Sequence, residues 1–154
     1  MPKIVYKQII NAPIEICFDL ARNVEVHTKT TTKTNEKAVG GVTTGLLEEG
    51  DTVTWEATHF GIRQRLTAKI VQMERPNQFK DIMVNGAFHS FSHTHDFLEV
   101  AEGTLMIDTF EYKSPFGVLG VLADKLYLER YMREFIISRS IELKKIAEQN
   151  RMLH

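Results

Sequence analysis

The chain has 154 residues, of which 43% are hydrophobic and 25% are charged, as in an ordinary soluble globular domain. Its 19 Lys and Arg residues nearly balance its 20 Asp and Glu residues, so the charge offers no general attraction to nucleic acid or to an anionic membrane. No apolar run approaches the roughly 18 residues of a membrane span. With one cysteine, Cys17, and no secretory leader pattern, we expect residues 1–154 to form a single cytoplasmic domain.

The start of the chain predicts a strand and then a helix. Lys3 to Ile10 is rich in β-branched residues, which favour a strand. Asn11 signals a helix start, and Pro13 suits the first helical turn. The apolar positions that follow have the spacing of a short amphipathic helix: Ile14, Cys17, Phe18 and Ala21. Cys17 is therefore expected to be a small buried hydrophobe rather than a nucleophile.

The segment from Asn23 to Gly41 leaves two interpretations open. Its threonines at positions 28, 30, 31 and 32 suit either a strand or a loop. The glycine pair in Val39–Val42 predicts a turn.

An antiparallel meander is predicted from Asp51 onward. With Phe60-Gly61 as a two-residue turn, Trp55 faces Leu66 on one side of the sheet and Glu56 faces Arg65 on the other. Apolar and charged pairs thus separate onto opposite faces, which supports this register. Further turns are predicted at Arg75-Pro76-Asn77, Asn85-Gly86 and Glu102-Gly103.

The predicted hairpin over Phe91 to Tyr112 carries ionisable side chains among aromatic ones. Its inward face comprises Phe91, His93, His95, Phe97, Met106, Asp108, Phe110 and Tyr112. Pairing Ala101 with Thr104 gives these cross-strand neighbours: His93 with Tyr112, His95 with Phe110, and Phe97 with Asp108. The face of Asp81 is ambiguous, because the Asn85-Gly86 turn would place it opposite Ser90, on the outer face. Such an inward face suits a ligand cavity better than a plain core.

The end of the chain predicts one long helix, because no Gly or Pro occurs after Gly120. Its apolar stripe consists of Val121, Leu128, Met132, Phe135, Ile136, Leu143 and Ile146. Arg139 lies within this stripe. Either its methylene stem carries the charge to the rim, or it reaches a cavity acid such as Asp108 or Asp81.

The element order predicts an α+β fold with an antiparallel sheet curved round the C-terminal helix. The chain resembles the START-related, Bet v 1-like helix-grip (SRPBCC) superfamily, which includes polyketide cyclases and dehydrases, aromatic-ligand binders and lipid-transport proteins. The resemblance rests on element order and on Gly86-Ala87-Phe88, His93-Thr94-His95-Asp96-Phe97, Gly103-Thr104 with Asp108, and Pro115-Phe116-Gly117. It implies a seven-stranded sheet, two short helices after the first strand, and a cavity for an apolar or aromatic ligand.

The predicted ligand-binding residues combine an apolar lining with ionisable groups. They are Trp55, His59, Leu66, Phe91, His93, His95, Phe97, Met106, Asp108, Phe110, Tyr112, Met132, Phe135 and Arg139. Two histidines at i and i+2 could share a metal if Asp108, His59 or His89 added a ligand. The favoured interpretation is a hydrogen-bonded network that orients a ligand, with no metal and no cofactor.

Three functions remain open from the sequence. The leading hypothesis is binding of a small hydrophobic or aromatic molecule by a monomer or homodimer, with no nucleic-acid partner. The alternative is a polyketide cyclase-like or dehydratase-like enzyme, with His93 or His95 as general base and Tyr112 or Asp108 as its partner. The third is a protein-interaction module with a filled pocket. The chain has no recognisable nucleophile–base motif and no glycine-rich phosphate loop, so whether it is an enzyme stays open.

Overall fold

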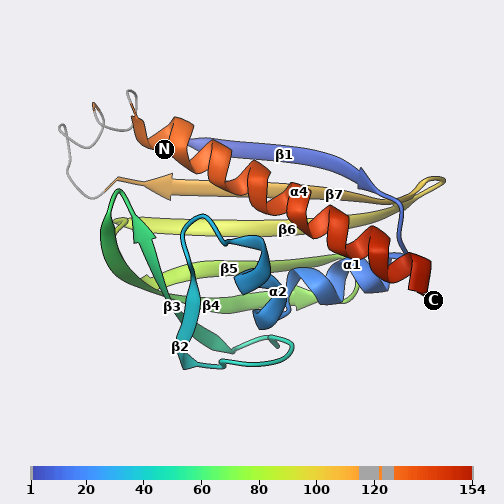
Figure 1. Cartoon of the computed structure of the whole chain (residues 1–154), viewed down its shortest axis with the longest axis horizontal. Helices are drawn as coiled ribbons and strands as arrows, with labels where there is room; N and C mark the ends of the chain where they lie inside the picture. The colour runs from blue at the N-terminus through green and yellow to red at the C-terminus, as the bar shows by residue number, and fades with distance from the viewer. Residues whose placement is uncertain (1, 115–121, 123–126, 154) are drawn as a thin grey trace.

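The computed structural model describes residues 2–114, 122 and 127–153, and it confirms the α+β helix-grip prediction (Figure 1). A seven-stranded antiparallel sheet, in the order β1-β7-β6-β5-β4-β3-β2, curves round one long helix, α4. The elements are β1 (Lys3–Ile10), α1 (Ile14–Ala21), α2 (Val24–Thr30), β2 (Lys37–Gly41), β3 (Thr52–His59), β4 (Ile62–Glu74), β5 (Gln78–Asn85), β6 (Ser90–Val100), β7 (Gly103–Lys113) and α4 (Glu129–Leu153). No helix in the described part of the chain is long and apolar enough to cross a membrane.

Helix α1 has the predicted amphipathic face but begins later than Asn11. Pro13 is its N-cap residue, in an extended conformation and without a side-chain capping bond. The predicted apolar positions are all buried: Ile14, Cys17, Phe18 and Ala21. Proline suits this site because the first helical N–H groups have no partner within the helix.

The ambiguous segment forms a second helix and an edge strand. Asn23 caps α2, because its side-chain oxygen accepts the backbone N–H of Val26 at 3.0 Å. The turn predicted at Val39–Val42 is wrong: β2 runs to Gly41 with a bulge beyond Ala38. A Cβ at Gly41 would lie 2.3 Å from the Thr52 carbonyl oxygen. Glycine at this position therefore allows β2 and β3 to approach closely, and it does not form a hairpin turn.

The β3–β4 hairpin has the predicted register. Phe60 and Gly61 both have positive φ, at 53° and 74°, as a two-residue primed turn requires. Trp55 pairs with Leu66 and Glu56 with Arg65. Apolar burial on one face and ion pairing on the other determine this register together, which explains why the sequence predicted it.

The predicted register of β6 and β7 is wrong by two residues. Val100 pairs with Gly103, so the turn consists of Ala101 and Glu102. The correct pairs are Phe91 with Tyr112, His93 with Phe110, His95 with Asp108, and Phe97 with Met106. A two-residue shift leaves the inward face unchanged and alters only which inward residues meet. The turn comes one residue earlier than predicted, and Gly103, the first residue after it, can adopt the required φ of 135° because it has no side chain.

The predicted two-residue turn at Asn85-Gly86, which left the face of Asp81 ambiguous, is also wrong. Asp81 pairs with His93, so the two residues lie on the same face of the sheet. Pairing of β5 with β6 stops at Ile82 and Ser92, whereas Asn85 pairs with β4. The last residues of β5 therefore stay with β4, and residues 86–89 form a longer connection than the Asn-Gly signal suggested.

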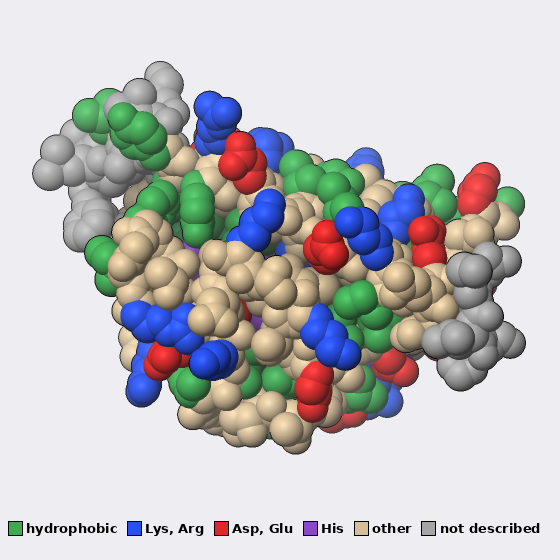
Figure 2. Space-filling model, in the orientation of Figure 1, with side chains coloured by type: hydrophobic (Ala, Val, Ile, Leu, Met, Phe, Trp, Pro, Cys, Tyr) green, Lys and Arg blue, Asp and Glu red, His purple; other side chains and the backbone are tan. Residues whose placement is uncertain are grey.

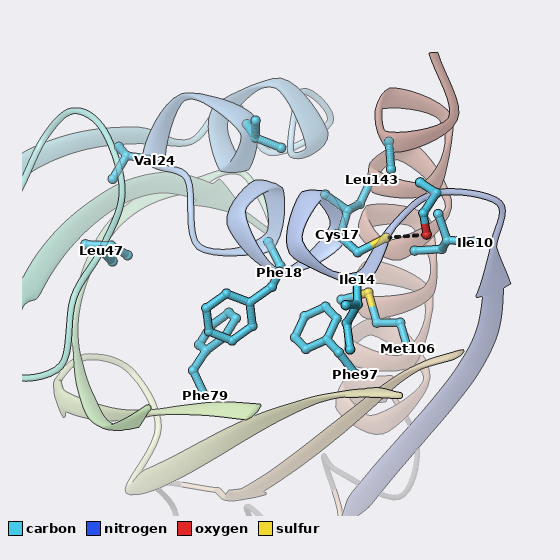
Figure 3. Packing of buried hydrophobic residues seen from close by; sticks show 14 of the residues in the cluster. Ile10, Ile14, Cys17, Phe18, Val24, Leu47, Phe79, Phe97, Met106 and Leu143 are labelled. Atoms are coloured by element: carbon cyan, nitrogen blue, oxygen red, sulfur yellow. Dashed lines mark hydrogen bonds between the residues drawn. The ribbon is translucent and has the colours of Figure 1, made fainter. Parts of the chain in front are cut away.

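Two hydrophobic clusters fill the space between the sheet and the helices. In one of them, beneath α1, the ring of Phe18 makes edge contacts with Phe79 and Phe97 at 5.4 Å each (Figure 3). Cys17 is fully buried there, which raises the pKa of its thiol and confirms it as a packed hydrophobe. The other cluster lies beneath the first half of α4 and includes Ile4, Ala68, Phe91, Phe110, Tyr112, Met132 and Ile136.

Helix α4 buries most of its predicted stripe. Met132, Ile136 and Leu143 are buried, and Leu128, Phe135 and Ile146 pack at the margins of the clusters. Val121 and the Pro115-Phe116-Gly117 motif lie outside the described residues.

Gly103→Ala should destabilise the fold much more than Gly45→Ala. Both glycines have positive φ, at 135° and 81°. A Cβ at Gly103 would lie 2.3 Å from the Ile10 carbonyl oxygen, whereas one at Gly45 meets nothing within 4 Å. We expect Gly45→Ala to cost about 1 kcal/mol and Gly103→Ala at least about 3 kcal/mol, measured by urea denaturation. Equal losses would show that the Gly103 contact does not matter.

Candidate functional site

A pocket of about 520 Å³ lies between the sheet and α4. Most of its lining is apolar: Trp55, Ala57, Phe60, Ile62, Leu66, Ala68, Ala87, Phe88, Phe91, Phe110, Leu128, Met132, Phe135 and Ile136. Phe60, Ile62 and Tyr127 line the pocket and are also more than 60% exposed, at 63%, 63% and 69%. Figure 2 shows hydrophobic side chains at the end of the molecule where α4 begins. These residues therefore mark the pocket's opening to solvent.

Ionisable side chains from five segments interrupt this apolar lining. They are His27 of α2, Glu36 just before β2, Asp81 of β5, His93 of β6 and Arg139 of α4. A separate pair, His59 and Tyr131, also lines the pocket, with Nδ1 of the histidine 2.5 Å from the tyrosine hydroxyl.

Asp108 is the centre of a buried cluster behind this wall. Its Oδ1 lies 3.1 Å from Nε2 of His93 and 2.9 Å from Nδ1 of His95. Its Oδ2 accepts the hydroxyl of Ser140 at 2.8 Å. Gln8 of β1 in turn donates to the Ser140 carbonyl at 2.8 Å. The carboxylate thus connects the middle of the sheet to α4.

His95 lies between two carboxylates and between two rings. Its Nε2 is 3.1 Å from Asp81, and its Nδ1 makes an ion-pair contact with Asp108 rather than a well-directed hydrogen bond. The ring stacks on Phe79 at 4.2 Å and on His93 at 3.9 Å. With a carboxylate beside each nitrogen, the imidazolium form is favoured.

The two histidines are driven toward different charge states. Burial opposes the charge on His95, but Asp108 and Asp81 outweigh it and raise the pKa of His95 above its ordinary value. Burial and the charge on His95 lower the pKa of His93, so His93 is neutral at neutral pH. Burial also opposes the charge on Asp108, yet bonds from both histidines hold its pKa well below the usual range.

A second acid–histidine pair lies on α2 and the segment before β2. Nε2 of His27 is 2.9 Å from Oε1 of Glu36, and Thr34 donates to Oε2 at 3.1 Å. The imidazole stacks on Trp55 at 3.8 Å. Burial lowers the pKa of His27, so this histidine is neutral at neutral pH. The electrostatic interaction and hydrogen bond with His27, with the charge of Arg139, outweigh the effect of burial on Glu36 and lower its pKa.

Arg139 faces this polar wall without a carboxylate partner of its own. It lines the pocket, and among the described residues it forms no ion pair. Its charge still lowers the pKa values of Glu36 and Asp81, which places all three in one electrostatic group. Of the two predicted positions, Arg139 therefore lies in the pocket wall, near Asp81 rather than paired with it.

Asp81, His93 and His95 are the residues that could hold a divalent metal. Each offers a ligand atom, and these atoms lie within 4.8 Å of one another. A metal would have to replace the proton that His95 holds between two carboxylates. The ion pairs and hydrogen bonds of the cluster already account for its burial, so its residues need no metal to explain their arrangement.

The structure brings together most, but not all, of the residues predicted for the site. Nine line the pocket: Trp55, His59, Leu66, Phe91, His93, Phe110, Met132, Phe135 and Arg139. His95, Met106 and Asp108 lie behind its wall, around a smaller hollow that Arg139 and Ser140 also line. Phe97 and Tyr112 line neither space. Tyr112, expected opposite His93, instead packs its ring against Phe88 and Phe110.

Sequence reasoning missed several polar residues of the site. Ser140 had a usable signal, because it interrupts the apolar face of α4 between Ile136 and Leu143. Glu36 and His27 had none, since the elements that carry them were ambiguous. His27 reaches the pocket because α2 packs near α4, and Glu36 is placed beside it by their contact, neither of which a local pattern specifies.

The fold is of the Bet v 1-like helix-grip class, as solved structures show. Protein TTHA0849 from Thermus thermophilus is 22% identical, with a TM-score of 0.76, covering 94% of this chain and 95% of that one. Protein CV1439 from Chromobacterium violaceum is 11% identical, with a TM-score of 0.73 and coverage of 95% and 96%. Ginseng major latex-like protein 151 from Panax ginseng is 15% identical, with a TM-score of 0.68 and coverage of 95% and 97%.

Comparison with family models gives no match, and neither does comparison with curated protein sequences. The similarity to solved structures therefore establishes the fold, and the function must be argued from this chain's own residues.

Asp108→Asn should lower the pKa of His95, because the substitution removes a carboxylate charge 2.9 Å from its Nδ1. The histidine ring protons, followed by NMR across a pH titration, measure this change. Loss of the buried charge should also cost about 3 kcal/mol of unfolding free energy. Asp96→Asn is the matched control, since Asp96 lies on the other face of β6 and bonds Gln78.

The sign of the pH effect follows from the raised pKa of His95. Protonation of His95 stabilises the folded state fully below its unfolded pKa of about 6.5, and this stabilisation is lost as the pH rises through the folded pKa. The stability difference between wild type and Asp108→Asn should therefore shrink on the alkaline side. An unchanged His95 titration in the variant would contradict the proposed charge arrangement.

Proposed function

We propose that this protein binds a small, largely apolar molecule in the pocket between the sheet and α4. The pocket itself is the observation that carries the proposal. Its volume of about 520 Å³ falls within the range of roughly 300–1,000 Å³ typical of ligand sites. An apolar lining with a few convergent polar groups is the usual composition of such sites.

The pocket lining has an apolar region and a polar region, which suit two different parts of a bound molecule. Phe88, Phe91 and Phe110 offer aromatic faces and edges, so that region suits a ring system or an aliphatic body. Glu36, Asp81, His93 and Arg139 offer hydrogen bonds and suit a single polar end. The exposed side chains of Phe60 and Ile62 provide an apolar route from solvent into the pocket.

Ala68→Phe should block ligand binding while preserving the fold. Ala68 is buried at 7% exposure on the pocket wall, and a phenyl group there would occupy space that the ligand needs. Titration with a fluorescent apolar probe such as pyrene should show affinity reduced at least about tenfold. Ala101→Phe, in the β6–β7 turn at the other end of the sheet, is the control and should bind pyrene like the wild type. Equal binding by both variants would overturn the proposal.

Acid–base catalysis on the bound molecule is the second candidate, and the state of His93 favours it. His93 lines the pocket, is neutral, and lies 3.1 Å from Asp108 through Nε2. A proton on Nε2 leaves Nδ1 as the basic nitrogen, an arrangement that suits a general base of a cyclase or dehydratase.

Native mass spectrometry of protein purified from its own host separates these two candidates. A released organic compound is then incubated with wild type and with His93→Gln. Catalysis predicts conversion by the wild type and at least about hundredfold slower conversion by the variant, with binding retained. A compound that stays unchanged in both samples supports binding alone.

A further inference from the structure

The polar end of the pocket holds more negative than positive charge. The carboxylates on its wall are Glu36 and Asp81, and the cation beside them is Arg139, whereas Asp108 and the imidazolium of His95 contact each other behind the wall. Arg65 also lines the pocket, but it is 70% exposed and pairs with Glu56. The other histidines there, His27 and His93, are neutral. Two carboxylates on the wall therefore lie with one guanidinium in a region largely removed from water, where charge imbalance has large effects.

The two carboxylates on the pocket wall retain the capacity to accept further hydrogen bonds. Within the described part of the chain, Glu36 accepts one bond at each oxygen, from His27 and Thr34, and Asp81 has one polar side-chain contact, with His95. Each carboxylate oxygen can accept two hydrogen bonds. Arg139 is the complementary donor, because it forms no ion pair among the described residues and its charge acts on both carboxylates.

We propose that the pocket selects a ligand whose polar end is an uncharged hydroxyl group, a phenol or an alcohol, and rejects a carboxylate. The inference rests on the proposed binding function and specifies its ligand class. A hydroxyl group can donate to Glu36 or Asp81 and accept from Arg139. A ligand carboxylate gains Arg139 but faces two carboxylates that it cannot satisfy. A ligand ammonium group gains the carboxylates, but it loses the hydration of a full charge and lies beside the guanidinium, and a hydroxyl group avoids both costs.

Four fluorescent probes with one ring system test this selection: pyrene, hydroxypyrene, pyrenecarboxylate and pyrenemethylamine. At neutral pH they are uncharged, uncharged, anionic and cationic. We expect hydroxypyrene to bind the wild type at least about tenfold more tightly than either charged probe, and more tightly than pyrene. Tighter binding of the carboxylate or the amine would overturn the inference.

Charge-neutralising variants assign the selection to named residues. Glu36→Gln and Asp81→Asn should each raise the affinity for pyrenecarboxylate about tenfold, because each removes a negative charge and keeps the side-chain shape. Arg139→Met should weaken binding of hydroxypyrene and pyrenecarboxylate. Arg133→Met is the matched control, because Arg133 is 46% exposed on α4 and pairs with Glu129. Circular dichroism and urea denaturation verify that each variant folds.

The outcomes distinguish a failure of the hydroxyl selection from a failure of the proposed binding function. If pyrene binds and hydroxypyrene shows no preference over the charged probes, the hydroxyl selection is wrong and the binding function stands. If none of the four probes binds the wild type, the binding function fails and the selection fails with it. A preference for hydroxypyrene that Glu36→Gln and Asp81→Asn both leave unchanged would also overturn the assignment to these carboxylates.

Discussion

The buried carboxylate of Asp108 is the interaction on which the arrangement of the site depends. Isolated in the interior, its charge would be costly, and two hydrogen-bonding groups, His93 and Ser140, and an ion pair with His95 offset that cost. Because these groups come from β6 and α4, satisfying one charge fixes the helix against the sheet. The same contacts set the ring positions of both histidines, and His95 then draws Asp81 into the cluster.

This constraint divides the interior into two regions with different properties. Beneath α1, aromatic and aliphatic side chains such as Phe18, Phe79 and Phe97 pack directly against one another. Beneath the first half of α4, the aromatic cluster around Phe91 and Phe110 leaves an open pocket. The cluster centred on Asp108 lies between these regions. Its polar contacts hold the helix and the sheet in place where direct apolar packing is incomplete.

Local patterns predicted the fold well and the site only partly. The face of each inner strand followed from alternation, so His93, His95 and Asp108 were placed inward correctly. Their cross-strand partners were predicted wrongly, because the alternation of inward and outward residues is unchanged by a shift of two residues. Nothing in the local sequence distinguished a turn at Ala101 and Glu102 from the predicted turn at Glu102 and Gly103. The face of Asp81 was left ambiguous, because pairing to β4 outweighed the Asn-Gly signal. Glu36 enters the site from the segment before β2, where it bonds His27 and Thr34, and a local sequence pattern does not encode these contacts.

The residues most difficult to predict are also those that give the pocket its chemical character. The fold is shared with proteins only 11–22% identical to this chain, so the sheet and α4 alone specify little about the ligand. The apolar lining limits the size and shape of the ligand, and many molecules would meet those limits. Selectivity has to come from groups whose burial is costly unless they are partnered. Glu36, Asp81 and Arg139 reach one wall from separate segments, and their balance of charge determines which polar group that wall accepts.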